Sequence, residues 1–402
     1  MYSCPSLLRR RPGRQNVSQC IRRSAVCLIS AHIFNLQKRI VCLTLSRKDS
    51  IVPLSDITAL VSSAGLTLPQ SELEDWSVLL SGLNACAKDV LLLPDYFPAP
   101  DLSLYPRKEI HRPEGDATDK GGWAWKAHVV STKPTSDLLK NKTVALKDNI
   151  ALAGVKCTNG TEAVDWVPEV DATLVTRVLD AGGVILGKAA CENNCFGAVS
   201  DTSCTGPVQN PYADGYSTGG SSSGSGRLVG SGAVDVSVGA DQGGSIRLPS
   251  AHCGLVGLKP TWGLVPYTGC ISLEATIDHV GPMARSVQDC ATLLEVIAGS
   301  DGIDDRQPYN WAHRSVKFGE EINTYLGKAD ELPLKGIKVG VLEEGFSDPG
   351  TNPNVAAASR AAIVKLRELG AEVKKISIPL HKDSGMIWSK LLDFCILELQ
   401  AS

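Results

Sequence analysis

The chain has 402 residues, of which 43% are hydrophobic, and this allows one large domain or two ordinary domains with a buried core. A net charge of −3 argues against a nucleic-acid-binding protein. The 13 cysteines are odd in number and widely spaced, which excludes the disulfide framework of a small secreted domain and indicates a reducing compartment.

The N-terminal extension, residues 1–50, is basic. Residues 1–48 contain ten Lys and Arg and no Asp or Glu, which leaves 30 basic against 43 acidic residues in the rest of the chain. Such a segment resembles a mitochondrial transit peptide. Its apolar stretch 25–34 loosely resembles a signal peptide but is shorter than the ~20 residues that span a bilayer. We expect the extension to be disordered, a targeting segment or not part of the working protein. The predicted location is cytoplasmic, with a mitochondrial location as the alternative.

Residues 51–93 are predicted to form an N-terminal helical region, because apolar residues recur there at helical spacing. A second helix of this region is expected over 71–87, where Ser71 and Glu74 have the spacing of a capping box. The following residues, 94–137, are rich in Pro, Gly and charge, which favours an extended connector over the surface.

Residues 138–402 have the alternating pattern of an α/β core domain. A strand is predicted at 143–146 (TVAL), then a helix capped by Asp171, then a strand at 184–187 (VILG). This alternation predicts a mixed β-sheet core covered by helices on both faces. The later predicted elements are a helix from Ser286 and Asp289 to residue 298, a strand at 337–342, a helix at 354–369 and a strand at 373–378.

No cofactor and no metal are predicted. Residues 182–188 (GGVILGK) approach a phosphate-binding loop, but Ala189 stands where that loop needs Ser or Thr, and a strand runs through it. Cys191 and Cys195 could share a helix face as metal ligands. No CxxC or HExxH motif accompanies them, so buried thiols are the better interpretation.

The most informative stretch is 219–260, which contains eight serines and eleven glycines. It is not a flexible linker, because the alternating run 234–238 (VDVSV) predicts a half-buried strand between two glycine turns. Glycines on both sides permit positive φ and close backbone approach, so the main-chain N–H groups around Gln242, Gly243, Gly244 and Ser245 can point at one spot. This is how an oxyanion hole is built.

Two motifs in this stretch, GGSSSGS at 219–225 and GADQGGSIRLPSAHCGLVGLKPT at 239–261, resemble the amidase signature family. TVALKDN at 143–149 and ATIDHVGP at 275–282 are most similar to the amidases that follow nitrile hydratase and to their fungal relatives. The resemblance implies the amidase signature fold, with a mixed sheet and helices on both faces, and a C–N hydrolase that needs no cofactor.

The resemblance also implies a Ser–cis-Ser–Lys triad, with Ser245 as the nucleophile, Ser221 as the bridging serine and Lys147 as the base. Ser222 and Ser223 are then neighbours of the triad. Many family members have Gly where Ser223 stands, a departure that leaves the three triad positions intact.

The residues alone do not identify the base that would activate the serine nucleophile. A serine nucleophile needs a base within hydrogen-bond reach, and neither His252 nor His279 lies in a turn motif of the triad kind. A lysine can serve when burial or nearby positive charge lowers its pKa, and the apolar TVAL would bury Lys147. The strand by itself does not decide between this role and a lysine paired with Asp148 in solvent.

Three other residues of the stretch, Ser222, Asp241 and Arg247, are expected to lie beside the site without taking part in the triad. GSSSG at 220–224 fits a nucleophile elbow with Ser222 as the nucleophile, but a turn-rich loop precedes it where an elbow needs a strand. Asp241 and Arg247 are expected to form an ion pair that orients the loop around the nucleophile.

We therefore predict an amidase that hydrolyses carboxamides to carboxylic acid and ammonia through an acyl-enzyme. The expected partner is a small-molecule amide, with no nucleic acid and no membrane span, and a homodimer is left open. The alternatives are a glutaminase subunit of a tRNA-dependent amidotransferase and a truncated, inactive amidase-like protein.

The sequence ends at a point where the proteins it resembles continue. Residues 386–399 are rich in large apolar side chains, which would stay in water if no further segment covered them. Each exposed Leu or Ile forgoes ~1.5–3 kcal/mol of burial. We expect a C-terminally truncated chain of this kind to be poorly soluble and nearly inactive by itself.

Overall fold

The computed structural model describes residues 51–93, 98–308, 317–327, 332–348 and 350–390. Two compact units divide the chain into Met1–Tyr96 and Phe97–Ser402. The basic extension, residues 1–50, and the apolar end beyond residue 390 lie outside the described residues. No helix within the described ranges combines the length and the hydrophobicity needed to cross a membrane.

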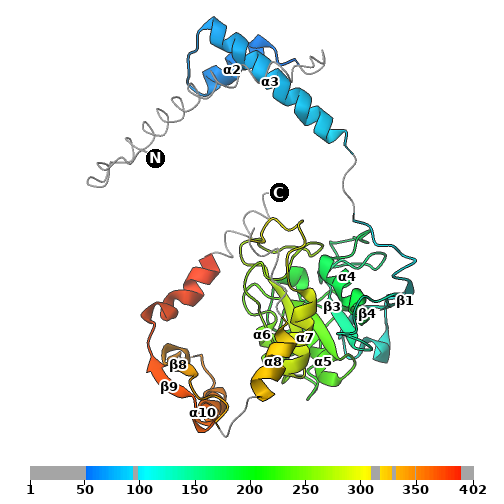
Figure 1. Cartoon of the computed structure of the whole chain (residues 1–402), viewed down its shortest axis with the longest axis vertical. Helices are drawn as coiled ribbons and strands as arrows, with labels where there is room; N and C mark the ends of the chain where they lie inside the picture. Colours follow the sequence, from blue (N-terminus) through cyan, green and yellow to red (C-terminus); the bar gives the residue numbers. More distant parts are fainter. Residues whose placement is uncertain (1–50, 94–97, 309–316, 328–331, 349, 391–402) are drawn as a thin grey trace. The chain divides into compact units, whose positions relative to one another are not determined.

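The first unit contains two helices, α2 (Leu54–Ser63) and α3 (Gln70–Leu91), which pack against each other (Figure 1). Their buried apolar residues are Ile57 and Leu73. The helical prediction for this region is correct in type. However, α3 begins directly after Pro69 with no side-chain cap, so the predicted capping box of Ser71 and Glu74 does not form.

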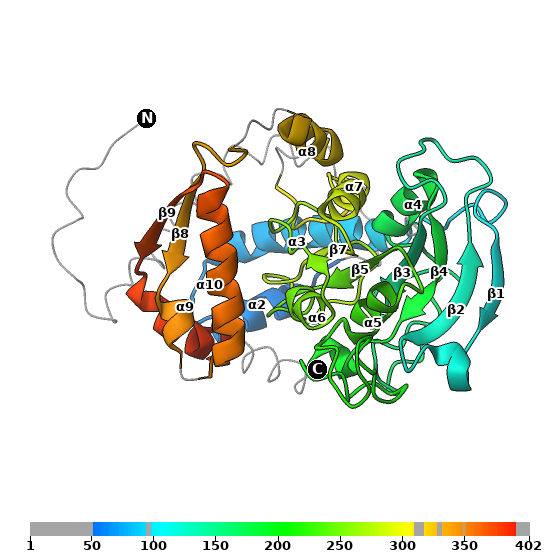
Figure 2. The same ribbon diagram turned by 90° about the horizontal axis from the view of Figure 1, so that it is seen from below.

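The second unit is built on a mixed sheet of seven strands in the order β1-β2-β4-β3-β5-β7-β6, and Figure 2 shows this order from β1 to β7. β3 pairs in parallel with β4 and β5 at the centre, and antiparallel pairs flank this centre on both sides. The strands are β1 (Arg107–His111), β2 (Trp123–Val129), β3 (Thr143–Lys147), β4 (Val184–Ala189), β5 (Val236–Ala240), β6 (Val256–Gly257) and β7 (Val280–Ala284).

Two of these strands, β1 and β2, lie in the segment predicted to be an extended connector, residues 94–137. In β2 the residues Trp123, Ala124, Ala127 and Val129 are buried, and the strand pairs with β4. The Pro- and Gly-rich flanks concealed this strand in the sequence. The segment is therefore part of the sheet and not a connector over the surface.

Helices cover both faces of the sheet, as predicted. Val144 and Leu146 of β3 belong to the main apolar core together with residues of α4 and α7, whereas Ala145 packs in a second cluster with Leu228 of α5. By the same alternation Lys147, at the end of β3, faces α5. Between β3 and residue 338, the α-helices of the described chain are α4 (Thr173–Asp180), α5 (Ser223–Ser231), α6 (Arg247–His252), α7 (Val287–Ile297) and α8 (Phe318–Gly327).

The predicted helix caps have different outcomes. Ser286 caps α7 as predicted, because its hydroxyl accepts a hydrogen bond from the Asp289 N–H at 3.0 Å. Asp171 does not cap α4. Its carboxylate accepts a hydrogen bond from the Ala153 N–H at 2.8 Å and forms an ion pair with Arg107.

The two last predicted strands form a parallel pair of their own. β8 (Lys338–Leu342) and β9 (Glu372–Ile376) are connected through α10 (Pro353–Glu368), and within the described residues neither strand pairs with the seven-stranded sheet. The remaining short helices are α9 (Glu344–Ser347), η2 (Gly115–Thr118), η3 (Asn193–Cys195) and η5 (Pro379–Asp383).

Gly224 allows α5 to approach the sheet backbone, which suggests a test of the fold. Its N–H donates to the Ala190 carbonyl at 2.8 Å, and an added Cβ would overlap the Gly122 carbonyl and the Ala190 amide nitrogen. We expect Gly224→Ala to destabilise this unit by about 1–3 kcal/mol or more, measured by urea denaturation. The matched control is Gly82→Ala in α3, where a Cβ meets open space. Equal unfolding curves for both variants would contradict this packing argument.

Candidate active site

Lys147 is fully buried at the end of β3. Its Nζ donates to the Ser221 Oγ at 2.7 Å and lies 3.3 Å from the Ala240 carbonyl oxygen. The alternative of a solvent-exposed pair with Asp148 is therefore wrong. Within the described residues no carboxylate forms an ion pair with Lys147. The two oxygens that it contacts are neutral, and the Cys195 thiol also lies close to the amine.

Asp148 instead pairs with a second buried lysine, Lys188, whose Nζ lies 3.0 Å from the Asp148 Oδ1. Both side chains are completely buried. The other carboxylate oxygen accepts hydrogen bonds from the N–H and the hydroxyl of Thr158. Burial by itself lowers the pKa of Lys188, but Cys157 and Asp148 outweigh it and the net shift is upward. Sequence patterns do not predict this pair, because they mark Lys188 only as the last residue of a rejected phosphate-binding loop.

Ser221 lies in the loop that leads into α5, and the peptide bond between Gly220 and Ser221 is cis. The side chain is completely buried, and the Ser221 carbonyl accepts the Glu192 N–H at 3.1 Å. The Glu192 carboxylate accepts hydrogen bonds from Asp201 and Thr202, so it holds the neighbouring loop. This role of Glu192 was also missed from the sequence, because no motif marks it.

The two serines that follow use their hydroxyls elsewhere. The Ser222 Oγ lies 3.2 Å from the Ala240 carbonyl oxygen and 3.3 Å from the Ala240 nitrogen, and the Ser223 Oγ lies 3.5 Å from the Ala190 carbonyl. The residues directly before Ser222 form no strand. An elbow nucleophile at Ser222 therefore lacks both the preceding strand and an unengaged hydroxyl.

Ser245 lies between β5 and α6 and has 9% of its surface exposed. Its carbonyl accepts the Ser222 N–H at 3.3 Å, which brings the main chain of the Ser245 loop beside that of the Ser221 loop. Within the described part of the chain the Ser245 Oγ makes no hydrogen bond, in contrast to the hydroxyls of Ser222 and Ser223.

Asp241 organises the loop around Ser245. Its buried carboxylate accepts the Gly244 N–H at 2.8 Å and the Ile246 N–H at 3.1 Å, and it forms the expected ion pair with Arg247 at 2.8 Å. Burial raises the pKa of Asp241, but the Arg247 guanidinium and the backbone N–H groups outweigh it, so the net shift is downward. The carboxylate therefore stays ionised and holds the turn.

The N–H groups of this loop divide into two sets. The Gly244 N–H is already bonded to Asp241. The N–H groups of Gln242, Gly243 and Ser245 make no hydrogen bond to another described residue. These three donors, and not all four of the stretch, remain to bind an anion or a polarised carbonyl oxygen.

The two candidate histidines, His252 and His279, make contacts away from the Ser245 hydroxyl. The His279 Nδ1 lies 2.7 Å from the Ile277 carbonyl oxygen, its Nε2 lies 3.1 Å from the Lys259 Nζ, and burial lowers the pKa of His279. The ring of His252 lies beside Gly219. Neither ring has a hydrogen bond to Ser245 among those of the described residues.

Cys191 and Cys195 are both buried and close to this site. The Cys195 Sγ lies 3.1 Å from the Asn159 Oδ1. A hydrogen bond with Cys191 lowers the pKa of Cys195, and the nearby Lys147 adds to this effect, while the pKa of Cys191 is raised. Within the described ranges no three His, Cys, Asp or Glu side chains are grouped so that they could hold a metal ion.

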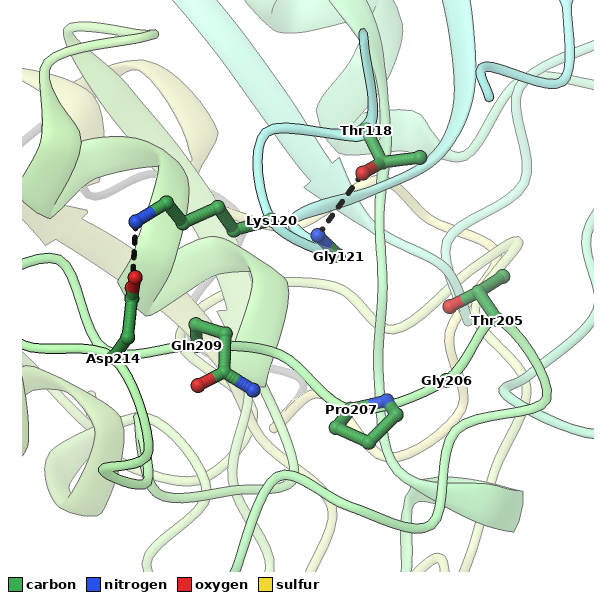
Figure 3. A pocket seen from close by; sticks show the side chains of 8 residues that line it. All are labelled: Thr118, Lys120, Gly121, Thr205, Gly206, Pro207, Gln209 and Asp214. Carbon is green, nitrogen blue, oxygen red and sulfur yellow. Dashed lines mark hydrogen bonds and ion pairs between the residues drawn. The ribbon is translucent and has the colours of Figure 1, made fainter. Parts of the chain in front are cut away.

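A separate surface depression lies away from these residues (Figure 3). Lys120 and Asp214 form an ion pair across it at 2.5 Å. None of the three proposed triad residues lines it. Its lining consists of Thr118, Lys120, Gly121, Thr205, Gly206, Pro207, Gln209 and Asp214.

The chain belongs to the amidase family, whose model matches residues 124–392. It is 48% identical over 254 residues to the enantioselective amidase of Rhodococcus rhodochrous, a match that covers 62% of this chain and 47% of that protein. It is 41% identical over 241 residues to a glutamyl-tRNA(Gln) amidotransferase subunit of Koribacter versatilis, covering 60% of this chain and 48% of that protein. The chain thus spans about half the length of these curated relatives.

Solved structures agree with this assignment. The corresponding glutamyl-tRNA(Gln) amidotransferase subunit from Thermotoga maritima matches with a TM-score of 0.58 and 31% identity, over 65% of this chain and 56% of that chain. The native peptide amidase from Stenotrophomonas maltophilia matches with a TM-score of 0.55 and 33% identity, over 63% of this chain and 51% of that chain. The mixed sheet with helices on both faces is therefore the fold of this family.

The lowered pKa of Asp241 gives a pH-dependent prediction. A carboxylate with a lowered folded-state pKa stabilises the fold above its unfolded pKa of ~4, and this contribution disappears as the pH falls through the folded-state value. We expect Asp241→Asn to lower the free energy of unfolding by about 1.5–3 kcal/mol at pH 7, and by progressively less in acid, measured by urea denaturation.

The exposed pair of Asp214 and Lys120 supplies the control, because Asp214→Asn removes a carboxylate that solvent screens. This control should change unfolding little at any pH. An Asp241→Asn deficit that stays constant from pH 7 to acid would contradict the proposed ionised carboxylate.

Proposed function

We propose that this protein is an amidase that hydrolyses carboxamides to a carboxylic acid and ammonia, with Ser245 as nucleophile, Ser221 as relay and Lys147 as base. The observation that carries the proposal is the 2.7 Å hydrogen bond between the Lys147 Nζ and the Ser221 Oγ in a fully buried site. We assign the base to Lys147 because its amine contacts the Ser221 hydroxyl and no described carboxylate, whereas Lys188 is held in an ion pair with Asp148.

The first half of the proposed reaction forms the acyl-enzyme. Ser245 attacks the amide carbonyl carbon and gives its proton to the Ser221 oxygen, while the Ser221 proton moves to the Lys147 nitrogen. The tetrahedral intermediate collapses when the same relay returns a proton to the amide nitrogen, and ammonia leaves. The bond formed is an ester to Ser245, and the bond broken is the C–N bond.

The second half releases the acid. Water attacks the Ser245 ester and gives its proton to the same relay, which then protonates the Ser245 oxygen as the ester bond breaks. In both halves the N–H groups of Gln242, Gly243 and Ser245 hold the oxyanion. The Gly244 N–H is engaged by Asp241, so we assign it to the support of the loop.

A second candidate function is the glutaminase subunit of a tRNA-dependent amidotransferase. It is supported by the similarity to the amidotransferase subunits of Koribacter versatilis and Thermotoga maritima. The same three residues would then release ammonia from glutamine. The similarity to the enantioselective amidase is higher, at 48% identity, and therefore we place the amidase first.

The triad proposal predicts how three substitutions differ. Ser245→Ala and Lys147→Met should each reduce amide turnover by at least ~10³-fold, because one removes the nucleophile and the other the base. Ser221→Ala should be milder, because a water molecule can occupy the site of the relay hydroxyl. Ammonia release and labelling by a fluorophosphonate, with the labelled residue located by mass spectrometry, measure these effects.

Ser222→Ala is the matched control for this series, because the Ser222 hydroxyl is bonded to Ala240 and not to Lys147. Its protein should still be labelled at Ser245. Label recovered on Ser222 of the wild-type protein, or full turnover by Lys147→Met, would contradict the assigned roles.

The two candidate functions predict different substrates. An amidase should release ammonia from aliphatic, aromatic or 2-arylpropionamide substrates without another protein, and Ser245→Ala should not. A glutaminase subunit should be inactive on these amides and act on glutamine, with activity that rises when amidotransferase partner subunits are added. A screen of both substrate groups with the same protein preparation decides between them.

A further inference from the structure

Tyr267 lies where the two halves of the proposed site meet. Its hydroxyl oxygen is 3.3 Å from the Asn149 Nδ2, 3.3 Å from the Gln242 Nε2 and 3.3 Å from the Ile271 carbonyl oxygen. Asn149 follows Lys147 by two residues, and Gln242 precedes Ser245 by three. One hydroxyl therefore contacts both the segment of the proposed base and the segment of the proposed nucleophile.

The orientation of the two amide side chains follows from their other partners. The Gln242 Nε2 donates to the Asp278 carboxylate at 2.7 Å, and the Asn149 Nδ2 donates to the Ile271 carbonyl at 3.2 Å. Both nitrogens are thus donors, so the Tyr267 oxygen accepts from both and its own proton goes to the Ile271 carbonyl. The hydroxyl uses its donor and both acceptor sites, and a phenylalanine ring could replace none of these three bonds.

The ring that carries this hydroxyl is itself fixed. It is 3% exposed, and the Arg306 guanidinium lies 4.6 Å from its centroid. The Tyr267 N–H donates to the Asp304 carboxylate at 2.7 Å, and the same carboxylate holds Arg306. Burial, with Asp278 nearby, raises the pKa of Tyr267 well above its usual range, so the hydroxyl keeps its proton.

The Tyr267 hydroxyl contributes more to holding Gln242 in place than to holding Asn149 in place. Main-chain hydrogen bonds already join the Asn149 segment to residues 269–271, because the Ile271 N–H donates to the Asn149 carbonyl and the Ala151 N–H to the Gly269 carbonyl, both at 2.8 Å. The side chain of Gln242 is held by Tyr267 and Asp278 alone among the described residues, and its Oε1 is buried without a hydrogen-bond partner there.

We infer that Tyr267 is a positioning residue for amide hydrolysis: its hydroxyl fixes the Gln242 side chain and thereby the Gln242 and Gly243 N–H groups, relative to the Lys147 segment. This inference rests on the proposed function. Oxyanion donors act only when they are already aimed at the position of the developing charge, and small displacements of such groups have large effects on rate. Tyr267 acts through Gln242 and does not touch the reacting atoms.

The test compares Tyr267→Phe with a matched tyrosine elsewhere. We expect Tyr267→Phe to lower kcat by about 10- to 100-fold with little change in KM, because the loss concerns transition-state alignment and not substrate binding. The control is Tyr105→Phe, since Tyr105 is also buried and its hydroxyl donates to Asp180 at 2.7 Å. Tyr105→Phe should melt at a lower temperature but keep the wild-type kcat.

A double-substitution cycle separates positioning from simple destabilisation. If Tyr267 acts through Gln242, then Gln242→Met should lower kcat similarly, and adding Tyr267→Phe to it should cost little more. Independent, multiplicative effects of the two substitutions would overturn the inference. Where Tyr267→Phe does not fold, Gln242→Met alone decides, and an unchanged kcat for that variant would also overturn the inference.

Fluorophosphonate labelling of the wild-type protein shows whether the inference about Tyr267 or the proposed function itself is wrong. If fluorophosphonate does not label Ser245 of the wild type, the proposed function is wrong. A second outcome is that wild-type Ser245 is labelled and the Tyr267→Phe variant shows wild-type rates of both labelling and amide turnover. The proposed function then stands, and Tyr267 has no positioning role. Slower labelling of Tyr267→Phe, with Tyr105→Phe at the wild-type rate, is the expected result.

Discussion

The arrangement of the site depends on which of two buried lysines pairs with one buried carboxylate. Lys147 is the last residue of β3 and Lys188 the last but one of the neighbouring parallel strand β4, and both are completely removed from solvent. Asp148 pairs with Lys188 and not with Lys147. An unpaired buried charge is costly, and of these two lysines only Lys188 has its charge compensated by a carboxylate. The ion pair with Asp148 thus distinguishes Lys188, a structural lysine, from Lys147, the proposed base.

Close backbone packing brings the serines to this lysine. Gly239 in β5 has the Ser222 Oγ, the Met283 Sδ and Ile246 at contact distance from any added Cβ. Gly224 places the first turn of α5 against the end of β4. These two glycines let the loop that carries Ser221 lie on the strand end that carries Lys147. The glycines of this stretch therefore serve close approach as well as turn formation.

Sequence patterns predicted the parts of this fold that are specified locally. The alternating or apolar runs of β3, β4 and β5 are near their predicted places, and so is the Ser286 cap of α7. Partners distant in sequence were not predicted. The β2 strand is flanked by Pro and Gly, and within the described residues β8 and β9 pair with each other and not with the main sheet. The Asp148–Lys188 pair joins residues 40 positions apart. The sequence does contain one indication of that pair, because Lys188 directly follows the predicted strand 184–187.

Three consecutive residues at the end of β3, Lys147 to Asn149, have side chains that contact three different parts of the chain. Lys147 contacts Ser221, Asp148 contacts Lys188, and Asn149 contacts Tyr267, although all three are fully buried. In a strand, neighbouring side chains would point to only two opposite faces. Here the Ile150 N–H bonds back to the Lys147 carbonyl at 3.0 Å, and this turn directs the three side chains to three different partners. The turn therefore lets one short segment contact three parts of the chain, at residues 221, 188 and 267, which a continued strand could not do.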